Sequence, residues 1–236
     1  MSCISDAHQP FPRTGVLAQN LNLSLDDLRL KIGKTQATVY SYIVASVKNP
    51  EGDFIQKGSA PNFQGDLITL CTCKHRMRTS LHDMLEWKNK WIAGFTGVEA
   101  GNGSNALVYL MKVGYTFESY SDFWNSKEIS RGTKQAKTTH LHKCGDIYQP
   151  KDAFVGPFDC QSYVLPCKEH SHYKDDGWHN DIDYKKGYKG RRHILLAGDT
   201  DYSFLWIKPK IVYNDRLPRN SKKLELKVMI ENLKIV

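Results

Sequence analysis

Short apolar runs alternate with polar and glycine-rich stretches along the chain, and β-branched and aromatic residues dominate these runs. They span residues 38–47, 67–70, 90–96, 106–113, 193–197 and 202–207. Such segments are typical of buried strands. The glycine-rich stretch 97–103 predicts that the strands on either side of it pair as a hairpin, and Asp199 and Asp201 predict a turn between the last two strands.

A helix with defined ends is predicted just before the first strand. Ser24 suits the N-cap, the apolar residues between Leu25 and Ile32 recur at helical spacing, and Gly33 can end the helix. A helix-turn-helix formed together with residues 35–43 is the alternative interpretation. The β-branched and aromatic residues of that second segment favour the strand.

The rest of the chain predicts shorter helices and a long irregular segment. Residues 80–87 suit a short helix, and the aromatic residues of 116–125 recur at the spacing of one packed helical face. Residues 131–143 contain basic but no acidic residues, which fits a phosphate-contacting loop or a solvated face. Residues 151–192 are predicted to be irregular, and residues 221–232 fit helix and strand equally.

These elements predict an α+β fold with a mixed sheet and peripheral helices. We expect an N-terminal arm with a short helix over residues 1–37, and one α+β domain over residues 38–236. A chain of 236 residues, 40% of them hydrophobic, can bury one sizeable core. No apolar run approaches the roughly 20 residues that cross a bilayer, and the first residues lack a signal-peptide pattern. We therefore expect a cytoplasmic protein without a membrane partner.

Charge and cysteine content narrow the chemistry. The formal net charge of +8 favours a polyanionic partner such as nucleic acid. Six cysteines are too few for a disulfide-dense scaffold and are expected to stay mostly free in a reducing cytosol. Cys160, Cys167, His170 and His172 approach the spacing of a zinc site, but the chain has no Cys-x-x-Cys pair. We predict no metal site, and the sequence indicates no particular cofactor.

The segment after residues 67–70 carries the strongest chemical signal. The predicted strand leads to Cys71 and Cys73. The basic or titratable residues that follow at once are Lys74, His75, Arg76 and Arg78. A positive field favours thiolate over thiol and attracts phosphate, which points to a site for an anionic partner. The alternative is a structural cysteine next to a solvated basic turn.

A series of short motifs runs through the chain in a fixed order. They are Ser41-Tyr42, Ala60-Pro61-Asn62, Thr69-Leu70, Cys73-Lys74, Arg78, Trp91-Ile92, Leu107-Val108-Tyr109 with Met111 and Val113, Phe123-Trp124, Gly145-Asp146-Ile147-Tyr148, His193-Ile194-Leu195 and Asp201-Tyr202. This order resembles the second nucleotide modification associated domain family, found in bacteria and phages, over roughly residues 39–208. The resemblance implies a link to DNA base modification systems. Asn89-Lys90 replaces the usual Gly-Asp, and the glycine expected near Tyr202 is missing.

The resemblance also implies positions for a site and a shape for the sheet. Its N-terminal-half cysteine, central Gly-Asp and C-terminal tyrosine correspond to Cys73, Gly145 with Asp146, and Tyr202. The strands over residues 91–113 are similar to those of PUA and EVE domains, small barrels that hold a nucleobase in an aromatic-walled pocket. We therefore expect the mixed sheet to be a partly closed, PUA/EVE-like barrel.

Two functions fit these observations. In the first, the protein is a nucleobase-modifying transferase of a bacterial or phage DNA modification or conflict system, acting on a nucleotide or DNA. Its predicted catalytic residues are Cys73 as nucleophile, Asp146, His172 and Tyr202. Its predicted nucleotide-binding residues are Asn62, Lys74, Arg76, Arg78, Trp91, Tyr109, Tyr148 and His193. In the second, the protein is a non-catalytic reader of modified bases, with the same basic and aromatic residues supplying affinity.

Overall fold

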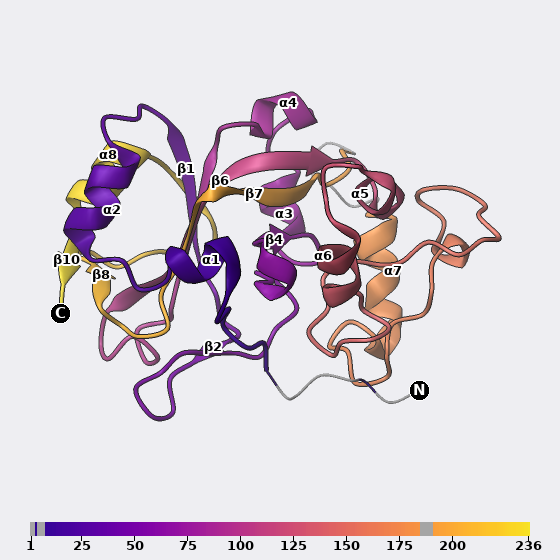
Figure 1. Cartoon of the computed structure of the whole chain (residues 1–236), viewed down its shortest axis with the longest axis horizontal. Helices are drawn as coiled ribbons and strands as arrows, with labels where there is room; N and C mark the ends of the chain where they lie inside the picture. Colours follow the sequence, from indigo (N-terminus) through magenta and orange to yellow (C-terminus); the bar gives the residue numbers. More distant parts are fainter. Residues whose placement is uncertain (1–2, 4–7, 185–190) are drawn as a thin grey trace. The chain divides into compact units, whose positions relative to one another are not determined.

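The computed structural model describes residue 3, residues 8–184 and residues 191–236, which form an α+β protein divided into two compact units. We call residues Met1–Pro10, Gly58–Lys88 and Tyr115–Ala197 the cysteine unit. Residues Phe11–Lys57, Asn89–Gly114 and Gly198–Val236 form the sheet unit. Figure 1 labels most of their helices and strands.

The sheet unit contains a mixed, open sheet. Its strands are β1 (Thr38–Ile43), β5 (Trp91–Phe95), β6 (Asn105–Phe117), β8 (Ile211–Tyr213), β9 (Lys222–Glu225) and β10 (Leu233–Ile235). They lie in the order β10-β8-β6-β5-β1-β9, with β1 and β5 parallel and the other pairs antiparallel. Among the described strands the two ends of this path, β10 and β9, do not pair with each other. The likeness to a PUA or EVE barrel therefore stays a prediction.

Helices α2 (Leu25–Ile32) and α8 (Leu226–Glu231) bury their apolar faces in the core of this unit. The Ser24 hydroxyl accepts a hydrogen bond from the N–H of Asp27, so the predicted cap is confirmed. In Figure 1 the two helices lie next to each other at one end of the sheet unit. The unit also contains α1 (Gly15–Gln19) and a two-stranded sheet of β2 (Val47–Lys48) and β3 (Ile55–Gln56).

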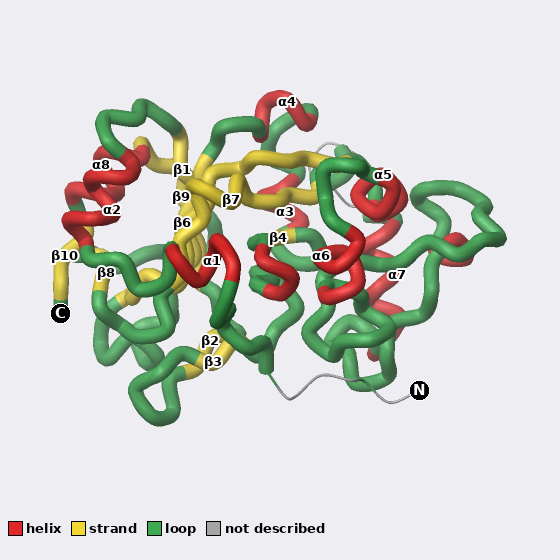
Figure 2. Tube along the Cα trace, in the orientation of Figure 1, coloured by secondary structure: helices red, strands yellow, loops and turns green. Residues whose placement is uncertain are grey.

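The cysteine unit is built mainly of short helices and loops, drawn red and green in Figure 2. Its helices are α3 (His75–Arg78), α4 (Met84–Trp87), α5 (Tyr120–Asn125), α6 (Arg131–Ala136) and α7 (Gly177–Ile182), with 3-10 turns η1 (Gln64–Asp66), η2 (Cys160–Ser162) and η3 (Lys174–Asp176). The strand β4 (Thr69–Leu70) pairs antiparallel with the first residues of β7 (Leu195–Leu205). Aromatic residues of α5 and α7, with Ile147, Tyr148 and Tyr163, form its core.

Several predicted elements are confirmed and two are wrong. The hairpin of β5 and β6 and the first strand are present, which excludes the helix-turn-helix. The predicted turn at Asp199 and Asp201 is wrong, because β7 runs unbroken from Leu195 to Leu205. Residues 151–192 are not wholly irregular, since they contain α7. Residues 221–232 hold both a strand and a helix, β9 followed by α8.

Two further predictions concern cysteines and membranes. Cys3 and Cys167 form a disulfide, whereas Cys71, Cys73, Cys144 and Cys160 form no disulfide among the described residues. None of the helices in the described residues is both long enough and apolar enough to span a bilayer. The predicted domain boundary between residues 37 and 38 stays a prediction.

Candidate active site

The backbone that carries Cys73 is held by a buried carboxylate. Asp146 accepts hydrogen bonds from the N–H of Cys71 at 3.0 Å, the N–H of Thr72 at 2.8 Å and the Thr72 hydroxyl at 2.7 Å. Burial raises the pKa of Asp146, and the hydrogen bonds from Thr72 oppose that rise. The N–H groups of Cys71 and Thr72 need a hydrogen-bond acceptor because β4 ends at Leu70 and leaves them without a strand neighbour.

Arg78 holds the same turn from the carbonyl side. Its guanidinium, which is fully buried, donates to the carbonyl oxygens of Cys73 at 2.8 Å, Cys71 at 2.5 Å and Ile194 at 2.8 Å. The planar fork of arginine suits three acceptors in one plane. The donors that would meet a phosphate are therefore engaged with backbone, and the predicted nucleotide contact of Arg78 stays a prediction.

Gly145 is needed for the close approach of the Asp146 segment. A Cβ at Gly145 would lie 2.5 Å from the carbonyl oxygen of Thr138 and 2.7 Å from the Cα of Thr139. Both are backbone atoms, so no side-chain adjustment could make room. The Gly145-Asp146 pair thus combines a residue that permits close packing with a residue that orders the Cys73 turn.

The Cys73 thiol is half-buried and faces polar side chains. Its sulfur lies 3.9 Å from the Ser59 hydroxyl and 4.0 Å from the Thr72 hydroxyl. Interaction with the Cys73 side chain also raises the pKa of the His172 imidazole. The two residues come from segments far apart in the sequence, the end of β4 and the loop before α7.

His172 is oriented by Asp181. Its Nδ1 donates to Oδ2 of Asp181 at 2.5 Å. Burial lowers the pKa of His172, but hydrogen bonds with Asp181 and Cys73, and the charges of both, raise it to about 10. The imidazole is therefore protonated at neutral pH and can serve as the cationic partner of a Cys73 thiolate.

Asp181 lies on the buried face of α7 and has three polar neighbours. Its side chain is 1% exposed, it accepts a hydrogen bond from the Tyr148 hydroxyl at 2.8 Å, and its Oδ1 lies 2.9 Å from Nε2 of His75. Burial raises the pKa of Asp181, yet the contacts with His172 and His75 hold that pKa below its ordinary value. The carboxylate thus stays charged between two histidines.

The second histidine has the opposite protonation preference. Burial lowers the pKa of His75, contact with Asp181 opposes this, and the charge of Arg78 lowers it further, leaving it below the ordinary value. Its ring stacks on Tyr184 and lies against His193, with centroid distances of 4.7 Å in both cases. His193 is itself buried, and burial holds its pKa well below the ordinary value.

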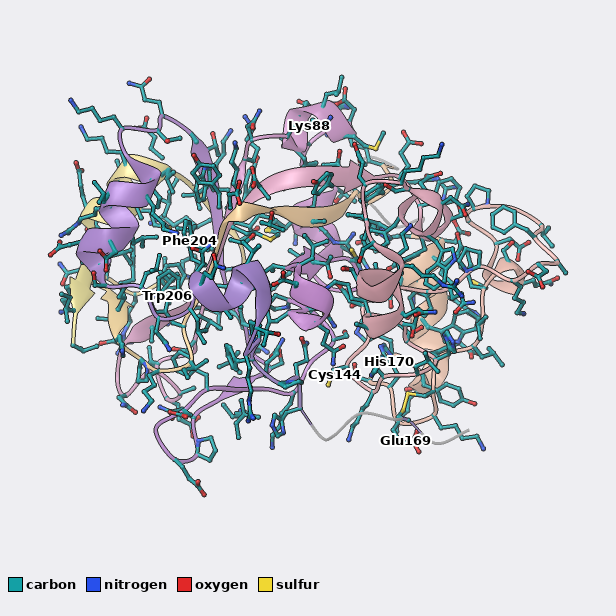
Figure 3. All side chains as sticks on the ribbon, viewed as in Figure 1. Lys88, Cys144, Glu169, His170, Phe204 and Trp206 are labelled. Carbon is teal, nitrogen blue, oxygen red and sulfur yellow. A yellow bond between two sulfur atoms is a disulfide. The ribbon has the colours of Figure 1, made fainter. Side chains whose placement is uncertain are left out.

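A third histidine supports His172 through the backbone. Nε2 of His170 lies 2.9 Å from the Gly145 carbonyl oxygen, and its Nδ1 accepts a hydrogen bond from the N–H of His172 at 3.1 Å. Burial lowers the pKa of His170 to about 4, so the ring is neutral, with its proton on Nε2. His170 therefore links the Gly145-Asp146 turn to the His172 backbone. Figure 3 labels it beside Glu169, which lies close to the Cys3–Cys167 disulfide.

The other predicted residues are distributed over both units. Asn62 is buried in the cysteine unit, where its side chain binds the Cys144 carbonyl oxygen and the Lys137 ammonium. Lys74 is half-buried and Arg76 exposed, both at α3. The predicted residues of the sheet unit are Trp91, Tyr109 and Tyr202. The first two are buried, whereas Tyr202 is 37% exposed, with the Lys112 ammonium 5.0 Å from its ring centroid.

The sequence analysis placed His75 in the titratable segment after Cys73 but predicted a catalytic or binding role neither for it nor for Asp181. A usable signal existed for Asp181: Trp178, Asp181 and Ile182 share one face of a short helix, and a carboxylate on an apolar face is unusual. The prediction that residues 151–192 are irregular hides that signal. Among the described residues, the one cluster of possible metal ligands is Cys3, Cys167 and Glu169, and its two cysteines are joined to each other.

The assembled group is a thiol, an imidazole and a buried carboxylate in series. In such an arrangement the imidazole exchanges a proton with the nucleophile, while the carboxylate fixes the orientation of the ring and stabilises its protonated form. Cys73 and His172 are predicted to belong to one site, and Cys73 is among the groups that raise the pKa of His172. Asp146, the third predicted catalytic residue of the cysteine unit, accepts hydrogen bonds from the backbone before Cys73.

Comparison with known proteins gives one match. The model of a family described as nucleotide modification associated domain 2 matches residues 36–204. Comparison with curated proteins and with solved structures gives no match. The matched range contains all of the residues that surround Cys73.

Proposed function

Because the chain belongs to the nucleotide modification associated domain 2 family, we propose that it is an enzyme that modifies a nucleotide or a base of DNA through a transient covalent bond to Cys73. The observation that carries this proposal is the bond from Nδ1 of His172 to the buried Asp181, in an imidazole whose pKa is also raised by Cys73. A reader that only stacks on a base has no need of a thiol paired with an imidazolium.

The first step is nucleophilic addition. His172 holds the proton of Cys73, and the thiolate adds to an electrophilic ring carbon of the base. As the sulfur–carbon bond forms, the displaced electron pair moves to a conjugated ring atom, which takes the proton from His172. At the activated ring carbon next to the adduct, an electrophilic donor then delivers a group, and the leaving group of the donor departs with the bonding electron pair. Loss of the proton from that carbon and elimination of the thiolate restore the ring and regenerate Cys73, while the conjugated atom returns its proton to His172.

Other predicted residues take supporting roles in this proposal. Asp146 acts as a positioning residue through the Cys71 and Thr72 backbone, and Arg76 and Lys74 contact phosphate. Tyr202 and the PUA/EVE-like aromatic pocket stay predictions. The setting we propose is a bacterial or phage DNA modification system in the cytoplasm, and the net charge of +8 supports a polyanionic partner.

Two measurements test the function. The first is the rate of iodoacetamide labelling of Cys73 at about pH 6, followed by peptide mass spectrometry, with Cys160 as an internal control because it is also free and half-buried. The second is nucleoside mass spectrometry of DNA and nucleotides from bacteria that express the protein, the Cys73→Ala variant or the Cys160→Ala variant.

We expect Cys73 to be labelled at least about tenfold faster than Cys160, and a new nucleoside to appear in cells with the natural protein and Cys160→Ala but not with Cys73→Ala. If Cys73 is labelled no faster than Cys160 and no nucleoside changes, while the purified protein still binds DNA, the enzyme hypothesis is wrong and the reader is favoured.

A further inference from the structure

One carboxylate at this site faces two histidines. Oδ2 of Asp181 accepts from Nδ1 of His172 at 2.5 Å, and Oδ1 lies 2.9 Å from Nε2 of His75. Their side chains are 24% and 20% exposed, so both retain a surface that can meet a substrate. Cys73 needs only one imidazole partner, so the proposed function gives His75 no role.

The surroundings of the two rings push their protonation states apart. Contacts with Asp181 and Cys73 keep His172 protonated, whereas burial and the neighbouring Arg78 keep His75 neutral at neutral pH. The groups that face His75 are Asp181, His172, His193, Tyr184 and Arg78. Paired groups with diverging pKa values are the usual basis for one acid and one base in the same reaction.

We infer that His75 is the second proton-transfer group of this site, the base that removes a proton from the ring carbon next to the one bonded to Cys73, and that the substrate is a pyrimidine. This inference rests on the proposed function. A pyrimidine has a carbon, C6, that is conjugated through C5 to the C4 carbonyl or imine. Thiolate addition at C6 therefore requires an acid near the C4 substituent and, to restore the ring, a base near C5.

The proposed proton transfers can be tested without any group transfer, through exchange of the hydrogen at C5. The Cys73 thiolate adds to C6, and His172 protonates the C4 substituent. A solvent proton then bonds to C5, and the C4 substituent returns its proton to His172, which leaves a saturated adduct. His75 removes the original C5 proton, and the resulting electron pair expels the thiolate from C6. In heavy water the net result is exchange of the C5 hydrogen for deuterium.

The experiment measures this exchange in the full-length protein. Deoxycytidine and deoxyuridine monophosphates, and a single-stranded oligonucleotide containing both bases, are incubated in deuterium oxide, and deuterium at C5 is followed by mass spectrometry. Denaturing mass spectrometry of the protein detects covalent adducts. The variants are His75→Gln, His75→Asn, Cys73→Ala and, as the matched control, His179→Gln, an exposed histidine of α7.

We expect exchange with the natural protein and with His179→Gln, and none with Cys73→Ala. His75→Gln is expected to exchange at least about 100-fold more slowly and to accumulate an adduct on Cys73, because its saturated intermediate cannot lose the C5 proton. Exchange by the natural protein should fall towards acidic pH as His75 becomes protonated.

The inference is wrong if folded His75→Gln, checked by circular dichroism, exchanges within about threefold of the natural rate or shows neither adduct nor exchange. If neither His75 variant folds, a natural rate that does not fall between about pH 8 and the lowest pH at which the protein stays folded contradicts it. A natural protein that exchanges no pyrimidine but produces a Cys73-dependent nucleoside in cells overturns this inference and leaves the proposed function standing.

Discussion

Thr72 and Asp146, which lie 74 positions apart in the chain, are joined by two hydrogen bonds, one from the Thr72 N–H at 2.8 Å and one from its hydroxyl at 2.7 Å. Because Thr72 directly precedes Cys73, this contact fixes the direction in which the backbone leads from β4 to the proposed nucleophile. Asp146 therefore holds the residue directly before Cys73 in place.

The first prediction follows from that contact. In the natural protein the Asp146 carboxylate accepts hydrogen bonds from backbone N–H groups. Asp146→Asn places an amide N–H opposite one of these donors, and a buried donor without a partner costs about 1–3 kcal/mol. We expect the free energy of unfolding, measured with urea, to fall by about 3 kcal/mol. The exposed Asp152→Asn should change it by less than about 0.5 kcal/mol. A variant that unfolds like the natural protein but loses activity would show that Asp146 is catalytic.

The second prediction concerns Gly145. Gly145→Ala forces the new Cβ against the Thr138 backbone, and overpacking of this kind costs about 1–3 kcal/mol. Since the Gly145 carbonyl oxygen also contacts His170, labelling of Cys73 by iodoacetamide should slow. Gly156→Ala is the matched control, because a Cβ there meets nothing within 4 Å. Equal thermal stability of the two variants would contradict the tight packing at Gly145.

The third prediction concerns the pH dependence of Cys73 reactivity. The charge and hydrogen bond of Asp181 raise the pKa of His172, so Asp181→Asn should let the imidazole lose its proton at lower pH. The thiolate then loses its cationic partner, and labelling of Cys73 at neutral pH should slow at least about tenfold.

The control for this measurement is Asp183→Asn, which changes a nearby carboxylate whose partner is Arg192 at 3.2 Å. Its pH profile should match that of the natural protein. Superimposable profiles for Asp181→Asn and the natural protein would mean that Asp181 does not control the thiol, and the proposed chain of Cys73, His172 and Asp181 would have to be abandoned.

Much of the local structure could be predicted because its causes lie close together in the chain. The helix between Ser24 and Gly33, the hairpin around residues 97–103 and the end of β4 at the cysteines all depend on caps, glycines and apolar period. The same local reasoning failed at Asp199, where turn-forming residues lie inside the strand β7 and pairing with neighbouring strands overrides their preference.

The candidate site divides in the same way. By itself, the sequence determined that Cys73 is followed by cationic and titratable residues, and its motif order pointed to the family. Only the tertiary structure decided that Arg78 is buried against carbonyl groups and that Asp181 lies between His172 and His75. Side-chain pairing across distant segments depends on how the core packs, and no local periodicity encodes it.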